Sequence, residues 1–312
     1  MAKIATRVAY GKTLAKLILE DEKIVVLDAD LSKSTKTADA QAVCPERHFN
    51  VGIAEGNMMG IAAGLATCGN TVFASSFAMF AAGRAYEQVR NSIGYTHLNV
   101  KICATHAGIT LGEDGASHQS IEDIALMREI PGMTVIQPCD SIETEQVIRA
   151  ISKVKGPFYV RLGRADVEVI HDDSYVFEIG KGHVLREGKD ITLVATGMMV
   201  QEALKAAEDL SEKGIEVSVI NISTIKPLDE ELIIQYAKKS KVVITCEEHS
   251  KFGGLGSAVA EVLSKNHPTL MDMVAIEDTF GESGKPFDLV DKYGLSSSSI
   301  VEKVLKHICK SS

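Results

Sequence analysis

Short apolar runs rich in Val and Ile alternate along the chain with segments of helical period. The runs are KIVVLDAD, FNVG, TVFASS, VKICATH, MTVIQP and PFYVRL, followed later by ITLVATG, IEVSVINI, KVVITCEE and MDMVAIED. Between them lie amphipathic stretches such as RVAYGKTLAKLILED and MVQEALKAAEDLSEKG. Strands that are apolar on both faces are typical of parallel sheets covered by helices. The pattern predicts an α/β protein with doubly wound sheets.

A more polar stretch, richer in Gly and charge, interrupts this alternation between about residues 165 and 190. Because 312 residues are enough to fill two cores, we expect two domains of unequal size, residues 1–170 and a smaller one at 171–312. The tail SSSSIVEKVLKHICKSS indicates a capped last helix, since serines precede an apolar run of helical period.

Composition and charge argue against several classes of protein. The net charge is -9 and no Lys/Arg run is sustained, which argues against a nucleic-acid or membrane-surface partner. No apolar stretch approaches the roughly 20 residues that span a bilayer, and the first residues lack a signal-peptide core, so we expect a cytoplasmic protein. The six cysteines form no C-x-x-C pair, which argues against zinc and favours reduced, mostly buried thiols.

Polar residues gather in the loops that follow the predicted strands, where ligand sites of open α/β sheets lie. The loop after IVVLDAD carries Asp30 and Ser34, and the turn after FNVG carries Glu55. The strand VKICATH ends at His106 and opens the glycine-rich stretch THAGITLGEDGASHQS, residues 105–120. These loops are the first candidates for a functional site.

The stretch 105–120 is too polar and too rich in glycine for the interior of a helix or strand. One interpretation is structural, because SHQSIED also resembles the start of a helix that leads into IEDIALMREI. His106, Glu113, Asp114 and His118 within one loop favour a functional interpretation, since histidine donates to hydroxyl, carbonyl or phosphate oxygens. We expect a site for a polar, phosphorylated small molecule and no metal ligands.

Two further features are ambiguous when taken alone. Glu55 is the one acid in NVGIAEGNMMGIAAGLA, where it could interact with the dipole at a helix N-terminus. Phe73, Phe77 and Phe80 lie in VFASSFAMF, and the helical spacing of the last two favours packing in the core.

The sequence as a whole resembles the C-terminal portion of a transketolase, covering its pyrimidine-binding and C-terminal domains. The resemblance rests on GIAEGNM, SSFAMFAAGRAYEQVRNS, THAGITLGEDGASHQSIEDIALMREIPGMTVIQPCD and FYVRLGR, in the order of that family. The segment CEEHSKFGGLGSAVAEVL adds support for the last domain.

The resemblance implies thiamine diphosphate chemistry, in which a glutamate hydrogen-bonds the aminopyrimidine ring and activates it. Glu55 matches that glutamate, and its small apolar neighbours favour a carboxyl group that shares a proton with a ring nitrogen. In the family, aromatic side chains pack on the ring; Phe77 and Phe80 match these positions best and Phe73 less well. Asp30 matches a family position near the cofactor, although an acid that closes a strand-to-loop turn is common.

The resemblance also implies contacts with a sugar phosphate. Asp114 and His118 match residues at the hydroxyl groups near the reacting carbons, and His106 matches a residue toward the phosphate end. The other implied phosphate contacts are Arg7, Ser34 and Arg164, with Arg161 as an alternative to Arg164 in RLGR. Arginine suits this role because its planar fork makes two charge-assisted hydrogen bonds to a phosphate.

The family binds the diphosphate and its Mg²⁺ or Ca²⁺ through a separate domain with a Gly-Asp-Gly motif, which this chain lacks. A whole transketolase needs about twice this length, with the missing half in front. We expect a separately encoded N-terminal subunit, because MAKIATRVAYGKTLAKLI opens with an ordinary start; a truncated chain is the alternative. The active enzyme is then expected to be a heterotetramer with two cofactors at subunit interfaces.

These features predict a subunit of a pentose-phosphate type of transketolase, inactive alone, that moves a two-carbon ketol unit from a ketose phosphate to an aldose phosphate. Two alternatives keep the cofactor: deoxyxylulose-phosphate synthases and the beta subunits of 2-oxo acid dehydrogenases. A third is a half without catalytic function that binds a partner. Gly56, where many relatives carry His, and HAGIT in place of a His-Asp start leave the sugar specificity open.

Overall fold

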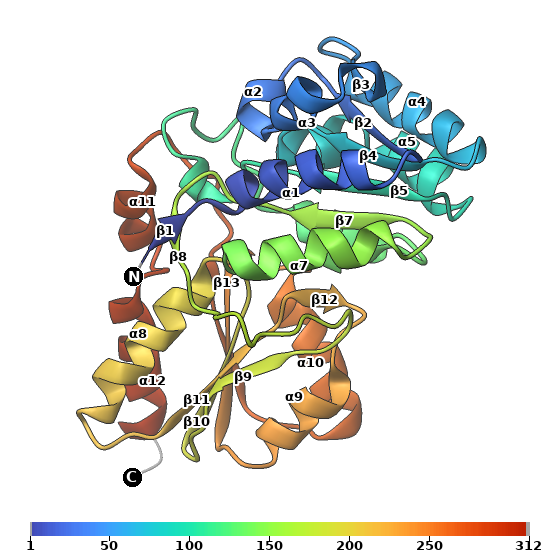
Figure 1. Ribbon diagram of the computed structural model, residues 1–312. Coiled ribbons are helices and arrows are strands. Elements are labelled where there is room, and N and C mark those ends of the chain that lie inside the picture. Colours follow the sequence, from blue (N-terminus) through green and yellow to red (C-terminus); the bar gives the residue numbers. More distant parts are fainter. Residues whose placement is uncertain (1, 310–312) are drawn as a thin grey trace.

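The computed structural model describes residues 2–309 and the side chains of residues 2–308, so the thiol of Cys309 lies outside the described part. Two α/β domains stack on each other (Figure 1), and the fold class predicted from the sequence is confirmed. The expected last helix is present as α12 (Ser297–Cys309). Among the described residues, none of the helices has the length and apolar character that a membrane span requires.

The first domain is built on a seven-stranded sheet. Its strands are β2 (Ile24–Asp28), β3 (His48–Asn50), β4 (Thr71–Ser75), β5 (Val100–Ala104), β6 (Thr134–Ile136), β7 (Phe158–Arg161) and β12 (Thr224–Lys226). They lie in the order β12-β6-β7-β5-β4-β2-β3, and only the pair β12–β6 is antiparallel. The six apolar runs before residue 165 therefore form the parallel strands expected of them.

Helices cover both faces of this sheet. The α-helices are α1 (Thr6–Glu20), α2 (Ser32–Thr35), α3 (Ala38–Val43), α4 (Glu55–Thr67), α5 (Tyr86–Gln88), α6 (Asp123–Glu129) and α7 (Ser141–Ser152). There are also two π-helices, η2 (Met79–Arg84) and η3 (Val89–Gly94), and two 3₁₀ turns, η1 (Pro45–Arg47) and η4 (Ile109–Leu111). α1 and α7 lie side by side on one face (Figure 1), while α4, the π-helices and α6 cover the other.

The second domain has a five-stranded sheet in the order β14-β13-β10-β11-β9, in which only β9 is antiparallel to its neighbour. The strands are β9 (His183–Arg186), β10 (Ile191–Ala195), β11 (Val217–Asn221), β13 (Val242–Ser250) and β14 (Met271–Ile276). One face packs against α8 (Met199–Ser211), α11 (Pro286–Lys292) and α12, and the other against α9 (Glu230–Ala237) and α10 (Leu255–Asn266).

One short strand from the second half of the chain returns to the sheet of the first domain. β12 comes from the second half of the chain but pairs with β6 of the first sheet, where the Lys226 ammonium donates to the carbonyl oxygens of Arg128 and Ile130 at 2.6 and 2.7 Å. β1 (Lys3–Ile4) and β8 (Val167–Glu168) form a separate two-stranded antiparallel sheet. We propose a domain boundary near residue 170, just after β8, with β12 inserted back across it.

The free thiols are mostly buried, as expected: among the described cysteines, only Cys68 is exposed. Cys139, Asp140 and His171 come close together, but hydrogen bonds already use these groups. The Asp140 carboxylate accepts from the backbone N–H groups of Glu143 and His171 and contacts the His171 ring nitrogen at 3.0 Å. We interpret the group as a helix cap that also holds the chain leading into the second domain.

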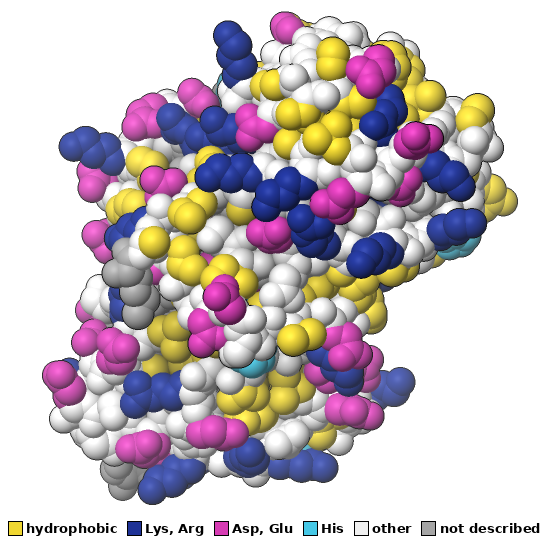
Figure 2. All heavy atoms as spheres, in the orientation of Figure 1, with side chains coloured by type: hydrophobic (Ala, Val, Ile, Leu, Met, Phe, Trp, Pro, Cys, Tyr) yellow, Lys and Arg dark blue, Asp and Glu magenta, His cyan; other side chains and the backbone are white. Residues whose placement is uncertain are grey.

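On the face in Figure 2, Lys and Arg alternate with Asp and Glu without a continuous basic surface.

Candidate active site

An aromatic wall forms at the carboxyl ends of β4 and β5. The rings of Phe77 and Phe80 are nearly parallel, with their centroids 5.8 Å apart. The His106 ring stacks on Phe77 at 3.8 Å, and the His118 ring meets Phe80 edge-on at 5.2 Å. Leu111 packs against the same two phenylalanines. The structure thus unites residues of two sequence motifs that lie about 30 positions apart, and it leaves the wall suited to a flat ring.

Glu55 is the first residue of α4, and its side chain is only 4% exposed. Its carboxylate oxygen lies 3.5 Å from the guanidinium of Arg84, whose carbon sits 4.0 Å above the Phe80 ring. Arg84 therefore connects the acid to the aromatic wall. The sequence suggested a carboxyl group surrounded by small apolar residues, so this half-exposed cationic neighbour was missed. The spacing of four residues from Phe80 to Arg84 was the available signal, since it places both on one helical face.

Phe80 and Arg84 belong to η2, a π-helix, and η3 follows directly after α5 with the same wide turn. π-helical turns are rare and occur frequently at functional sites. The apolar spacing of FAMFAAGRAYEQV predicts only a helix and does not distinguish an α-helix from a π-helix. The extra residue in each turn changes the direction in which the following side chains project.

A cluster of positive charge lies beside His106. Burial, together with the charges of Arg7, Arg164 and Lys36, lowers the pKa of His106 to about 3, so this imidazole is neutral at physiological pH. Burial and the charge of Arg164 also lower the pKa of Arg7. Arg7 donates to the Ser34 carbonyl oxygen at 2.7 Å, and Arg164 donates to Glu113 at 2.8 Å. Cations crowded together in this way favour an anionic ligand.

The backbone of His106 adopts a positive φ of 59°, which is uncommon for a residue with a side chain. Conformations of this kind persist where the surrounding structure imposes them, often at ligand-binding sites. Here the bridge between Phe77 and Thr105, and the Phe77 ring itself, hold the residue. The Thr105 hydroxyl and the ring nitrogen Nδ1 of His106 lie 2.8 Å apart.

Arg161 lies away from this cluster, although it is only three residues from Arg164. Its side chain is fully buried, and its Nε donates to Asp123 at 2.8 Å. Burial alone would raise the pKa of Asp123, but the charges of Arg161 and His249 and hydrogen bonds from Arg161 and Tyr159 outweigh it and lower the pKa. Arg161 is therefore committed to an internal ion pair.

The remaining predicted residues occupy different surroundings. Asp30 has a positive φ of 64° and bonds Asn50, and together with Ser34 it lines a pocket of about 320 Å³. Asp114 is exposed in the loop 105–120. Phe73 is fully buried under α1 and α7, on the face of the sheet opposite the aromatic wall. It therefore packs in the core and does not line the wall.

The residues present fit one half of thiamine diphosphate. A buried carboxylate beside two parallel aromatic rings suits a planar aminopyrimidine with a nitrogen that shares a proton. Within the described residues, the one group of side chains close enough together for a metal ion is that of Cys139, Asp140 and His171, which serves as a helix cap and is distinct from the aromatic wall. Residues 2–308 thus offer a fit to the ring and no comparable fit to a metal-bound diphosphate.

The neutral state of His106 gives a direct prediction. Its imidazole will not titrate between pH 5 and 9, which NMR can check by comparing histidine signals of the native chain with those of His106→Gln. The folded pKa of about 3 lies below the unfolded value near 6.5, so the unfolded state binds more protons between these values. The contribution of neutral His106 to the free energy of unfolding is therefore complete above about pH 6.5 and is lost toward pH 3. An NMR signal that belongs to His106 and titrates near pH 6.5 would contradict the prediction.

Comparisons with known proteins agree with this geometry. Residues 2–169 match the sequence profile of the transketolase pyrimidine binding domain, and residues 180–300 match that of the transketolase C-terminal domain. The chain is 54% identical over 309 residues to a Methanocaldococcus jannaschii protein provisionally named as a transketolase C-terminal section, covering 97% of this chain and 96% of that protein. It is 43% identical to a 6-deoxy-6-sulfo-D-fructose transketolase subunit of a Clostridium species, covering 95% and 92% of the two chains.

Among solved structures, one described as a split gene transketolase, an inactive β4 tetramer, superposes with a TM-score of 0.91 at 53% identity. The similarity covers 97% of this chain and 98% of the other. The fold and the two profiles thus define a pyrimidine-binding domain joined to a C-terminal domain. The chain belongs to the transketolase family and corresponds to its C-terminal section.

Proposed function

We propose that this chain is the C-terminal subunit of a thiamine-diphosphate-dependent transketolase that is active only with a separate N-terminal subunit. The reaction is the transfer of a two-carbon ketol unit from a ketose phosphate to an aldose phosphate. The observation that carries this proposal is the convergence of Glu55, the Phe77–Phe80 wall and the cationic cluster around His106. A half that only binds a partner has no need of this combination.

In this proposal Glu55 shares a proton with a nitrogen of the aminopyrimidine, while Phe77 and Phe80 hold the ring flat. When bound, thiamine diphosphate supplies a nucleophilic carbon that carries the two-carbon unit. The Arg84 guanidinium lies over Phe80 and beside Glu55, so it must yield its place above the ring to the cofactor. Asp30 lines the neighbouring pocket, at the edge of the proposed cofactor site.

Substrate recognition is assigned to the loop 105–120 and to the cationic cluster. Asp114 and His118 hydrogen-bond sugar hydroxyl groups and exchange protons with them; the exposure of Asp114 leaves it free to do so. His106, neutral by burial, donates or accepts one hydrogen bond without adding charge. Arg7, Arg164 and the Ser34 region bind the phosphate. We assign this role to Arg164 because Arg161 is held by Asp123.

The N-terminal subunit would supply the diphosphate site and its Mg²⁺ or Ca²⁺, and two chains of each kind would form a heterotetramer. The solved β4 tetramer of a similar chain, described as inactive, supports both self-association and the need for another subunit. The relative described as a sulfofructose transketolase subunit indicates that donors other than pentose phosphates are within the range of such chains.

Reconstitution tests the proposal. The chain is mixed with the product of a neighbouring gene that encodes the Gly-Asp-Gly domain, together with magnesium, thiamine diphosphate, xylulose 5-phosphate and ribose 5-phosphate. We expect sedoheptulose 7-phosphate, and none from either subunit alone. Deoxyxylulose phosphate from pyruvate and glyceraldehyde 3-phosphate would favour the synthase alternative. No ketol transfer with any ketose phosphate in a panel of donors, despite a stable complex, would reject the proposal.

A further inference from the structure

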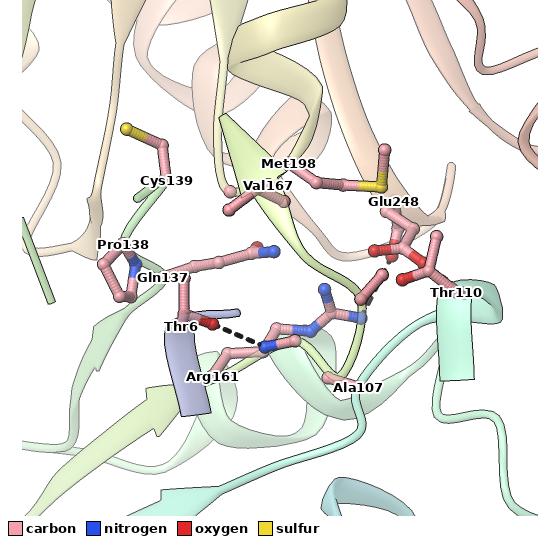
Figure 3. Close-up of a pocket in the computed structure, with 13 residues that line it drawn as sticks. Thr6, Ala107, Thr110, Gln137, Pro138, Cys139, Arg161, Val167, Met198 and Glu248 are labelled. Carbon is pink, nitrogen blue, oxygen red and sulfur yellow. Dashed lines mark hydrogen bonds between the residues drawn. The ribbon is translucent and has the colours of Figure 1, made fainter. Parts of the chain in front are cut away.

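Glu248 reaches from the second domain into the proposed substrate loop of the first. It lies near the end of β13, and its side chain is buried. Its carboxylate oxygen accepts a hydrogen bond from the backbone N–H of Thr110 at 2.6 Å, across 138 positions of sequence. Figure 3 shows this carboxyl group next to Thr110 at an interdomain cavity that Arg161 and Gln137 also line.

The loop is shaped to receive this carboxyl group. Gly108 has a φ of +80°, and a Cβ atom built there would lie 2.3 Å from the carboxyl carbon of Glu248. Only glycine allows this backbone conformation together with so close an approach. Gly108 of HAGIT thus leaves the space that the carboxyl group of Glu248, the second glutamate of CEEHS, occupies. Neither residue predicts the other from the sequence.

The second domain also holds the far end of the loop. The Gln119 amide donates to the carbonyl oxygens of Glu282 at 2.9 Å and of Ile109 at 3.0 Å, so it joins the loop to the segment before α11. Gly281 makes room for this amide, since a Cβ there would overlap Gln119. The two anchors fall on either side of Asp114, one next to His118 and the other close to His106.

Arg161 also links the substrate loop to the second domain. Its guanidinium donates to the carbonyl oxygen of Glu248 at 3.0 Å and to that of Ser120, the last residue of the loop, at 3.1 Å. Its own position is fixed by Asp123. The backbone of Glu248 is thus tied to the first domain, while its side chain supports the loop.

We propose that Glu248 is a positioning residue that sets the conformation of the substrate loop from the second domain. This inference deepens the proposed function and rests on it for the role of the loop. In this arrangement a principal task of the C-terminal domain is to present His106, Asp114 and His118 in fixed relative positions. Glu248 touches no substrate and acts only through the backbone at Thr110.

Hydrogen exchange on the chain as it exists, without cofactor or partner, tests the contact itself. We expect Glu248→Ala to speed exchange of peptides covering residues 107–119 by about 10-fold or more, because the Thr110 amide loses its acceptor. Glu248→Gln keeps a carbonyl acceptor and should restore most of the protection. Unchanged exchange of this loop in Glu248→Ala, or an equal increase over the whole chain, would overturn the proposal.

Glu247 provides the matched control. It is the preceding buried acid of β13, but its oxygens accept from the N–H groups of Leu255 and Gly256 at 2.7 and 2.8 Å, inside the second domain. Glu247→Ala should therefore speed exchange at the start of α10 and leave the loop 105–120 protected. Equal loosening of the loop by both variants would show a general loss of domain packing and reject a specific role for Glu248.

The reconstituted enzyme provides the functional test. For Glu248→Ala we expect the KM for the ketose phosphate to rise by about 10-fold, with a smaller change in kcat and no change in the thiamine diphosphate concentration for half activation. Glu248→Gln should rescue the KM. A loosened loop with an unchanged KM would overturn the positioning role. Absence of transfer by the native complex would instead reject the proposed function, and the exchange result would still report on the contact.

Discussion

Replacing Glu55 by Gln should lower the turnover of the reconstituted enzyme by about 100-fold or more while leaving the complex assembled. Glutamine has nearly the same size and keeps a hydrogen-bonding carbonyl, but it cannot take up and return a proton at neutral pH. The carboxylate is buried at the start of α4 beside the aromatic wall, so no water replaces it easily. Steady-state transfer assays at saturating cofactor measure the turnover, and light scattering measures the mass of the complex.

Two controls separate this effect from a loss of structure. Arg84 is half-exposed, so the loss of its ion pair with Glu55 should change the free energy of unfolding by less than about 1 kcal/mol. Glu208→Gln on the exposed side of α8 removes the same charge away from the site and should leave turnover unchanged. Native turnover in Glu55→Gln would show that the carboxyl group has no role in proton transfer.

The two parallel sheets could be predicted because several of their strands, namely β2, β4, β5, β10 and β11, are five residues long and buried on both faces, so they show in the sequence as apolar runs. β9 and β12 could not, since they are short and antiparallel at sheet edges. Phe73 lies in the core, although its motif also contains Phe77 and Phe80. In β4 alternate residues face opposite sides, and Phe73 shares its side with the core under α1 and α7, whereas Ala74 faces α4.

The residues of the site also differ in whether the sequence could predict them. Residues at strand ends, such as Glu55 and His106, could be selected because the carboxyl edge of a parallel sheet collects them. The resemblance to transketolases gave them roles that periodicity alone does not supply. Glu248 could not be found, because CEEHS reads as the continuation of a strand and its partner Thr110 lies in another domain. Arg84 required the packing of η2 against α4 before its contact with Glu55 became visible.

The two arginines of RLGR should separate phosphate binding from stability. Arg164→Met should raise the KM for a ketose phosphate by about 10- to 100-fold, because it removes a charge-assisted contact from the cluster with Arg7. The KM for a donor without phosphate should change little. The free energy of unfolding should also change little, since Arg164 is partly exposed and its contacts are an ion pair with the exposed Glu113 and a hydrogen bond to the Leu111 carbonyl oxygen. Kinetics with both donors measure the difference.

Arg161→Met should lower the free energy of unfolding and leave phosphate binding unchanged. It leaves the Asp123 carboxylate buried without its cationic partner, which destabilises the fold by about 3–5 kcal/mol in urea unfolding. Asp123→Asn in the Arg161→Met background should recover part of that loss, because it removes the unpaired charge. In the fraction that remains folded, the ratio of KM values for donors with and without phosphate should stay native. A raised ratio for Arg161→Met, with a native ratio for Arg164→Met, would move the phosphate contact to the buried arginine and overturn the assignment.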